Sequence, residues 1–101
     1  MKLSKNKILI TGATAGIGEA LLNKFLSLDN HVIALGRNEE KLKELARKDE
    51  RIIPFPCDIS KAEDLDKLIL FVEQQHPDTN MLINNAGIQY NYFFDEEPQL
   101  L

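Results

Sequence analysis

Four short apolar runs alternate along this chain with three stretches in which apolar residues recur at helical spacing. The apolar runs cover residues 7–11, 31–35, 51–55 and 81–85, and the helical stretches cover residues 17–28, 38–47 and 61–75. Apolar strands separated by helices are typical of a parallel sheet that is covered on both faces and joined by right-handed crossovers. The sequence therefore predicts an α/β fold: a doubly wound parallel sheet in three layers, α/β/α.

Local residue types support the predicted helix boundaries. Asn38 is a favourable N-cap for the second helix, and Ser60 with Glu63 predicts a capping box for the third. Helical spacing also predicts which residues face the sheet. These are Ile17, Ala20, Leu21, Phe25 and Leu28 in the first helix, and Leu65, Leu68, Ile69 and Val72 in the third.

Charge, hydropathy and cysteine content narrow the range of partners. The 101 residues carry a net charge of −4 and the lysines are scattered, so we expect no nucleic-acid partner. No run approaches the roughly 18 apolar residues of a membrane span, and the apolar part of the start is too short for a secretory signal, so we expect a cytoplasmic protein with no membrane partner.

Cys57 is the only cysteine, and we expect it to be a buried apolar residue. The acidic residues 95–97 are interpreted as solvated, and no metal site is predicted.

Three glycines, Gly12, Gly16 and Gly18, lie in the segment ITGATAGIGEA, where the first apolar run ends and the first helical stretch begins. Glycines in such a turn let the chain reverse without side-chain clashes, and they let phosphate groups approach backbone amides at a helix start. A purely structural turn is the alternative for a glycine pattern taken singly.

The residues beside this turn separate three kinds of anion-binding site. A nucleoside-triphosphate loop needs a lysine and a hydroxyl residue after the last glycine, but Gly18 is followed by Glu19 and Ala20. Methyl-donor and NAD sites usually have a carboxylate at the end of the second strand, where this chain has Gly36 and Arg37. A guanidinium forks onto phosphate oxygens, so Arg37 favours NADP over NAD through its 2′-phosphate. The alternative for Arg37 is a solvated residue before a helix.

Taken together, these motifs resemble the short-chain dehydrogenase/reductase family. The resemblance is carried by Thr11-Gly12-Ala13-Thr14-Ala15-Gly16-Ile17-Gly18, by Asp58 after the third apolar run, and by Asn84-Asn85-Ala86-Gly87 after the fourth, and it extends over residues 8–89. LINNAGIQ also resembles a bacterial branch of oxidoreductases of the D-alanine-transfer cluster. The resemblance implies a Rossmann-type sheet of strand order 3-2-1-4 that is incomplete, with residues 1–101 as an N-terminal NAD(P)-binding segment.

The resemblance also implies which residues contact the cofactor. In order they are Gly12, Thr14, Gly16, Ile17, Gly18, Arg37, Asn38, Asp58, Ile59, Asn85, Ala86, Gly87 and Ile88. The glycine turn approaches the pyrophosphate, with Thr14 as a hydroxyl donor, and Arg37 and Asn38 lie at the adenosine phosphate. Asp58 and Ile59 flank the adenine. Asn85, Ala86 and Gly87 line the ribose, with Ile88 beside them. Asp58 has an alternative as a loop carboxylate near a helix start. Asn84 and Asn85 have a structural role in the family too, tying the central strands together, and Thr11 bonds to that strand.

The resemblance implies a catalytic serine and a Tyr-x-x-x-Lys pair: the tyrosine exchanges a proton with the carbonyl or alcohol substrate, the lysine lowers the tyrosine pKa and the serine positions the substrate oxygen. Hydride itself passes between the substrate and NADP(H). Tyr90 and Tyr92 are followed four residues later by Phe94 and Glu96, and the last lysine is Lys67. No catalytic residue is therefore assigned, and we expect no turnover by this chain alone. Two alternatives stay open: a free-standing nucleotide-binding or assembly module that self-associates through an exposed fourth strand, and a truncated product.

Overall fold

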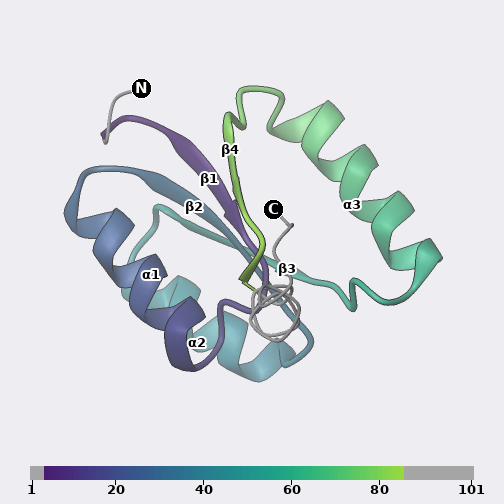
Figure 1. Cartoon of the computed structure of the whole chain (residues 1–101), viewed down its shortest axis with the longest axis horizontal. Coiled ribbons are helices and arrows are strands. Elements are labelled where there is room, and N and C mark those ends of the chain that lie inside the picture. Colours follow the sequence, from purple (N-terminus) through teal and green to yellow (C-terminus); the bar gives the residue numbers. More distant parts are fainter. Residues whose placement is uncertain (1–3, 86–101) are drawn as a thin grey trace, which may run out of the picture.

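The computed structural model describes residues 4–85, which form one parallel sheet with helices on both faces (Figure 1). Its elements are β1 (Lys7–Ile10), α1 (Gly16–Ser27), β2 (His31–Gly36), α2 (Glu39–Lys48), β3 (Ile52–Pro56), α3 (Ala62–Gln75) and β4 (Met81–Ile83). The strand order is β3-β2-β1-β4, and every pair is parallel. The predicted fold class and strand order are confirmed.

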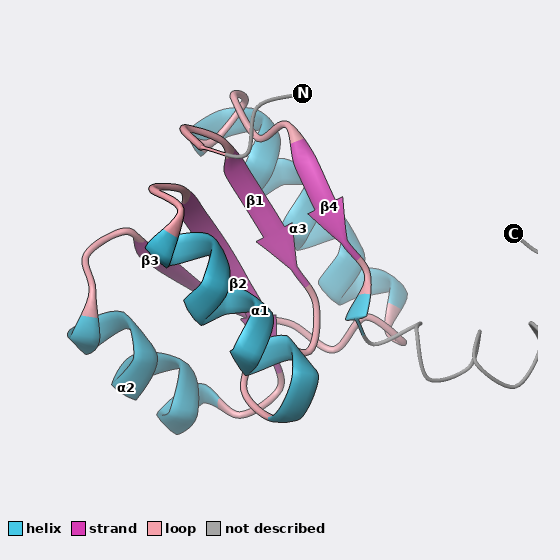
Figure 2. Cartoon of the chain, turned by 60° about the vertical axis from the view of Figure 1, so that its left-hand side comes forward, coloured by secondary structure: helices cyan, strands magenta, loops and turns pink. Residues whose placement is uncertain are grey.

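Two apolar clusters, one on each face of the sheet, form the core. On one face, Leu22 and Leu26 of α1 and Leu42 and Leu45 of α2 pack against side chains of β1, β2 and β3. On the other face, α3 contributes only half-buried side chains to a smaller cluster. Figure 2 shows this division, with α1 and α2 in front of the sheet and α3 behind it. Alternate side chains of a strand point to opposite faces, so each central strand supplies both clusters.

The predicted helix faces are partly wrong. In α1 the buried residues are Gly18, Leu22 and Leu26, while Ile17 is 62% exposed. Ala20 is exposed as well, and Leu21, Phe25 and Leu28 are half-buried. Leu21 and Phe25 pack against the first cluster as predicted, but the fully buried stripe is the adjacent one, about one residue or roughly 100° around the helix.

The prediction for α3 fails for a different reason. None of its residues is fully buried. Leu65 and Ile69 are exposed, while Leu68 and Val72 are half-buried against the second cluster as predicted. Apolar residues extend around much of this helix, and the side of it that does not meet the four-stranded sheet has no cover among residues 4–85.

One of the two predicted caps is confirmed. The Asn38 Oδ1 accepts a hydrogen bond of 3.1 Å from the Lys41 amide at the start of α2. The capping box of Ser60 and Glu63 is wrong, because the N-cap of α3 is Lys61 and makes no side-chain capping hydrogen bond. The Ser60 hydroxyl donates instead to the Asp58 carboxylate at 2.6 Å. The Ser60 side chain thus bonds to Asp58, two residues earlier, instead of to the backbone amides at the start of α3.

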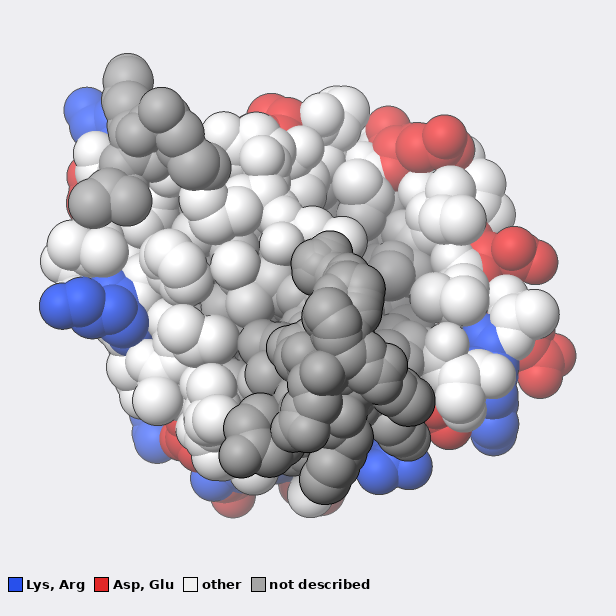
Figure 3. All heavy atoms as spheres, in the orientation of Figure 1, with Lys and Arg blue, Asp and Glu red and all other residues white. Residues whose placement is uncertain are grey.

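Charged side chains of both signs lie around the rim of the face drawn in Figure 3. Within residues 4–85, no helix combines the length and the apolar character needed to cross a membrane. Cys57 is a free thiol and is buried, as predicted. No group of three or more His, Cys, Asp or Glu side chains in the described part of the chain is arranged to hold a metal ion.

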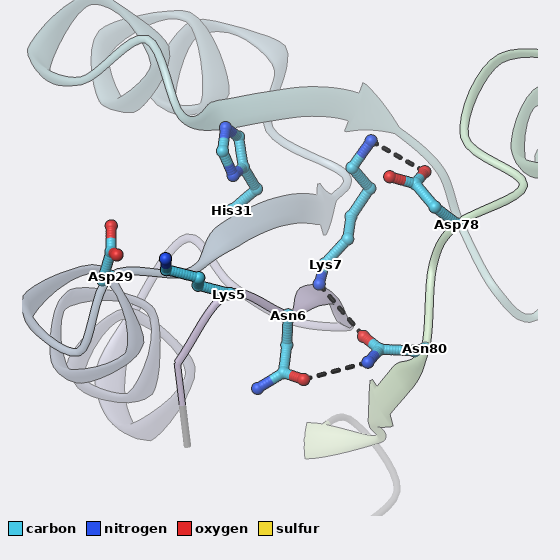
Figure 4. A pocket seen from close by; sticks show the side chains of 7 residues that line it. All are labelled: Lys5, Asn6, Lys7, Asp29, His31, Asp78 and Asn80. Atoms are coloured by element: carbon cyan, nitrogen blue, oxygen red, sulfur yellow. Dashed lines mark hydrogen bonds and ion pairs between the residues drawn. The ribbon is translucent and has the colours of Figure 1, made fainter. Parts of the chain in front are cut away.

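Asparagines join the strands at the amino end of the sheet. The Asn30 Oδ1, fully buried, accepts from the Asn6 backbone amide at 2.9 Å, and its Nδ2 donates to the Phe25 carbonyl at 2.9 Å. The Asn80 Nδ2 donates to the Asn6 Oδ1 at 2.9 Å, and its Oδ1 accepts from the Lys7 amide at 3.0 Å. Figure 4 shows Asn6, Lys7 and Asn80 meeting here, with the Lys7 ammonium turned to Asp78. These contacts tie the starts of β1, β2 and β4 together.

At the opposite end of β1, the chain enters α1 through a turn with tight backbone contacts. Gly12 and Gly16 have φ values of 62° and 58°, a region that disfavours side chains. Gly18 lies against the preceding turn, where a Cβ would overlap the Gly12 carbonyl and crowd the Asn85 amide. At Gly16 a Cβ would meet nothing within 4 Å. Gly18 therefore closes the turn, and Gly16 leaves an open surface.

We expect Asn30→Ala to lower the free energy of unfolding by about 3 kcal/mol, because it leaves buried donors and acceptors at the amino end unpaired. The matched control is Asn23→Ala, which removes an exposed asparagine of α1. Urea denaturation of both variants measures the difference. Equal stabilities would mean that the asparagine contacts do not hold the strands together.

The two glycines give a second prediction. Gly18→Ala should destabilise the chain by about 3 kcal/mol or more, since its methyl group has to displace backbone. Gly16→Ala should cost only about 1–2 kcal/mol, the strain of a left-handed alanine. Thermal unfolding of the two variants gives the order, and a Gly16→Ala variant less stable than Gly18→Ala would contradict the packing described for this turn.

Candidate functional site

The carboxyl ends of all four strands meet at one edge of the sheet. The chain leaves β1 toward β2 and β3 on one side and returns with β4 on the other, so the connections diverge beside β1. Ligands of open α/β sheets bind in the crevice beside such a point. The segments that follow β1, β2, β3 and β4 at this edge contain the residues that the sequence singled out.

Hydrogen bonds fix the glycine turn to the end of β4. The Thr11 backbone amide donates to the Ile83 carbonyl at 3.1 Å, and the Thr11 hydroxyl donates to the Asn84 Oδ1 at 3.1 Å. The Asn85 Nδ2 donates to the Gly12 carbonyl at 3.1 Å. The expected bond from Thr11 to this strand is confirmed, and the side chains of Asn84 and Asn85 both serve to hold the turn.

The start of α1 presents backbone amides to this edge. Its N-cap, Ala15, is extended at φ −157° and ψ 162°, and no side chain among the described residues caps the helix there. The first amides of a helix carry partial positive charge and are therefore suited to an anion. Glu19 is the acidic residue of the first turn, and its carboxylate lies 4.0 Å from the Lys41 ammonium. The open space at Gly16 is where a phosphate group can approach these amides.

Thr14 connects this turn to the end of β2. A Cβ on Gly36 would lie 2.7 Å from the Thr14 Cγ2, so the threonine packs directly on the glycine backbone. The Ala13 amide donates to the Leu35 carbonyl at 2.9 Å and holds the turn against the same strand. Sequence positions more than twenty residues apart are thus adjacent.

A hollow of about 290 Å³ lies beyond Gly36, between the ends of β2 and β3. Its lining residues are Arg37, Glu39, Pro56, Cys57, Asp58, Lys61 and Asp64. Arg37 is exposed, and its positive charge acts on the Asp58 carboxylate across the hollow. The pKa of Asp58 lies below its ordinary value, first because Ser60 donates two hydrogen bonds to it and secondly because Arg37 and Lys61 are close. Asp58 is therefore an ionised acceptor at neutral pH.

The remaining predicted site residues differ in their surroundings. Asn38 is exposed, and its side-chain oxygen is engaged in capping α2. Ile59 packs against the second core cluster. Ile17 is exposed beside the glycine turn. Ala86, Gly87 and Ile88 lie outside the described residues.

Of the residues that line the hollow, only Arg37 and Asp58 were predicted as site residues; those not predicted include Lys61 and Asp64. Lys61 is the N-cap of α3, and Asp64 belongs to its first helical turn. Acidic residues are common in a first helical turn, so Asp64 had no distinguishing signal. Its carboxylate accepts from the Asp58 backbone amide at 2.8 Å, a contact between residues six positions apart that spacing does not predict.

Comparisons with known proteins agree with this geometry. The family model described as short chain dehydrogenase matches residues 6–99. The chain is 39% identical, over its full length, to an uncharacterized oxidoreductase of Bacillus subtilis named DltE, of which it covers 40%. It is 33% identical over 82 residues to the NADP-dependent 3-hydroxy acid dehydrogenase YdfG of Salmonella typhi; the match covers 80% of this chain and 33% of that enzyme.

A solved structure shows the same fold around a nucleotide. The L-sorbose reductase of Gluconobacter frateurii, complexed with NADPH and L-sorbose, superimposes with a TM-score of 0.78 at 29% identity, over 86% of this chain and 35% of the reductase. The chain thus spans between a third and two fifths of the length of these relatives. The family match over residues 6–99, the parallel sheet and the glycine turn agree: the chain belongs to the short chain dehydrogenase family.

Proposed function

We propose that residues 1–101 form the NADP-binding portion of a short-chain oxidoreductase that transfers hydride between NADP(H) and a carbonyl or alcohol substrate. The observation that carries the proposal is the juxtaposition of a helix start that no described side chain caps with a hollow lined by both a cation, Arg37, and an ionised acceptor, Asp58. A pyrophosphate fits the first feature and an adenosine 2′-phosphate fits the second.

Each part of the dinucleotide has a proposed partner in the chain. The amides of the glycine turn at Gly12, Gly16 and Gly18, with Ile17 and the Thr14 hydroxyl, bind the pyrophosphate. Arg37 binds the 2′-phosphate with Asn38 beside it, while Asp58 and Ile59 flank the adenine. Asn85, Ala86, Gly87 and Ile88 line the ribose.

The choice of NADP over NAD rests on charge. NAD sites usually have a carboxylate at the end of the second strand to accept from the ribose hydroxyls, and this chain has Arg37 there. Two cations, Arg37 and Lys61, and three carboxylates, Glu39, Asp58 and Asp64, line the hollow, so the proposed preference rests on the place of Arg37 after β2 and not on a net positive charge. The Salmonella relative is named NADP-dependent, and the Gluconobacter reductase was solved with NADPH.

The chemistry of the proposed reaction belongs to the dinucleotide, which when bound supplies or accepts the hydride. The described residues of this chain bind and orient it: the turn fixes the pyrophosphate, and the hollow fixes the adenosine end. Orientation matters because hydride transfer depends on holding the reacting atoms in one geometry. No residue of the chain is assigned to proton transfer in this proposal.

We expect Arg37→Ala to weaken NADP binding about tenfold, because an exposed charge-assisted phosphate contact contributes about 1.4 kcal/mol. Affinity for NAD should stay unchanged, since NAD lacks the 2′-phosphate. Isothermal titration calorimetry of the 101-residue chain with both nucleotides measures the effect. Arg47→Ala is the control, as it removes the same charge from the exposed last turn of α2.

Two results would contradict the proposal. Equal affinities of the unaltered chain for NADP and NAD would remove the role of Arg37. An equal loss in the Arg37→Ala and Arg47→Ala variants would mean that only general charge, and no specific phosphate contact, is being measured.

A further inference from the structure

Asp58 is held in place by contacts at three of its groups. Its backbone carbonyl accepts from the Lys61 amide at 3.0 Å, which closes a tight turn. Its Oδ1 accepts from the Ser60 amide at 3.0 Å and from the Ser60 hydroxyl at 2.6 Å. Its backbone amide donates to the Asp64 Oδ2 at 2.8 Å. Hydrogen bonds to its backbone carbonyl, its backbone amide and its side chain therefore fix the conformation of Asp58.

The second carboxylate oxygen of Asp58, the Oδ2, is not engaged in the same way. Within residues 4–85, the Oδ2 makes no hydrogen bond, and no cationic nitrogen lies within 4.0 Å of the carboxylate. Both bonds from Ser60 go to the Oδ1. Because the residue lines the hollow, this acceptor oxygen remains for a donor on a ligand.

The two residues that bond to Asp58 through their side chains, Ser60 and Asp64, belong to different parts of the fold. Ser60 is exposed and lies in the same turn, so its bonds shape the turn without fixing it in space. Asp64 belongs to α3, a helix of 14 residues, and its own backbone amide donates to the Lys61 carbonyl at 3.1 Å. Its carbonyl also accepts a weak bond of 3.9 Å from the buried Cys57 thiol. Asp64 therefore attaches the turn to α3.

We propose that Asp64 is a positioning residue for base recognition: it holds Asp58 so that the free Asp58 Oδ2 accepts the exocyclic amino group of adenine. This inference rests on the proposed function, since it requires the adenosine end of the dinucleotide to occupy the hollow. It adds a residue whose carboxylate bonds to the Asp58 backbone amide, and it predicts which base the hollow accepts. Hypoxanthine carries a carbonyl where adenine carries its amino group, so at that position an acceptor faces the negatively charged oxygen in place of a donor.

The test compares NADP with its hypoxanthine analogue, deamino-NADP, by calorimetry on the whole 101-residue chain. We expect the unaltered chain to bind NADP about tenfold more tightly than the analogue, the ratio typical of one hydrogen bond to a charged group. In Asp64→Ala this ratio should fall to near one. In Asp64→Asn it should stay close to tenfold, because the amide oxygen accepts the same bond from the Asp58 amide.

Glu63→Ala is the matched control, because it removes an exposed carboxylate from the same turn of α3. It should keep the tenfold ratio. The ratio is used because a general loss of stability lowers both affinities alike and leaves the ratio unchanged. If Asp64→Ala does not fold, as judged by circular dichroism, Asp64→Ser takes its place, since serine is too short to span the distance and should also give a ratio near one.

The outcomes separate the two proposals. An unaltered chain that binds neither nucleotide overturns the proposed function and this inference with it. Binding of NADP with no preference over the analogue leaves the proposed function in place and removes the contact to the base. A tenfold ratio that survives in Asp64→Ala or Asp64→Ser shows that Asp58 acts without Asp64, and this inference is then wrong.

Discussion

The close approach of Gly18 to the Gly12 carbonyl is the contact on which the arrangement at the carboxyl end of the sheet depends. It brings the first turn of α1 against the end of β1, where a side chain would have to push the backbone apart. The same Gly12 carbonyl accepts the Asn85 amide, so β4 is fixed to the turn by the group that Gly18 covers. The start of α1, the end of β1 and the end of β4 consequently form one unit.

The two ends of the sheet are built from different interactions. At the amino end, buried asparagines satisfy one another and the backbone, and the Lys7 ammonium is paired with Asp78. At the carboxyl end, within residues 4–85, no side chain caps the start of α1 and one carboxylate oxygen of Asp58 makes no hydrogen bond. Satisfied polar groups stabilise a fold, whereas unsatisfied ones at a concave surface are suited to a ligand. The amino end also has a hollow, of about 350 Å³, so it is the helix start and the Asp58 oxygen, and not concavity alone, that support placing the dinucleotide at the carboxyl end.

The sequence predicted the parts of the structure that depend on local pattern. Alternation of apolar runs and helical stretches was enough for the parallel sheet, and Asn38 was recognisable as a cap because its preference is local. In α1, Leu21 and Phe25 pack on the core as predicted, but the fully buried stripe is the neighbouring one, because packing decides which of two adjacent apolar stripes lies against the sheet. Ser60 failed as a cap because Asp58 competes for its hydroxyl.

Some residues of the candidate site were predictable from the sequence, and others were not. Gly12, Gly16 and Gly18 stand out because few other residues tolerate their backbone angles or contacts. Arg37 was found from its place after the second strand and Asp58 through the family resemblance, and both line one hollow in the structure. Asp64 was not predictable, because its role depends on a turn that brings residues six positions apart into contact, and an acidic residue at a helix start has a common alternative explanation.

Central to this account is the location of the dinucleotide at the carboxyl end of the sheet. Backbone amide chemical shifts of the ¹⁵N-labelled chain, followed by NMR during titration with NADP, test it most directly. The account predicts saturable shifts at Gly12 to Gly18, at Arg37 and Asn38, and at Asp58 and Ile59, with Asn6, Asn30 and Asn80 at the amino end unmoved. Shifts confined to the amino end, or none at all at saturating NADP, would contradict it.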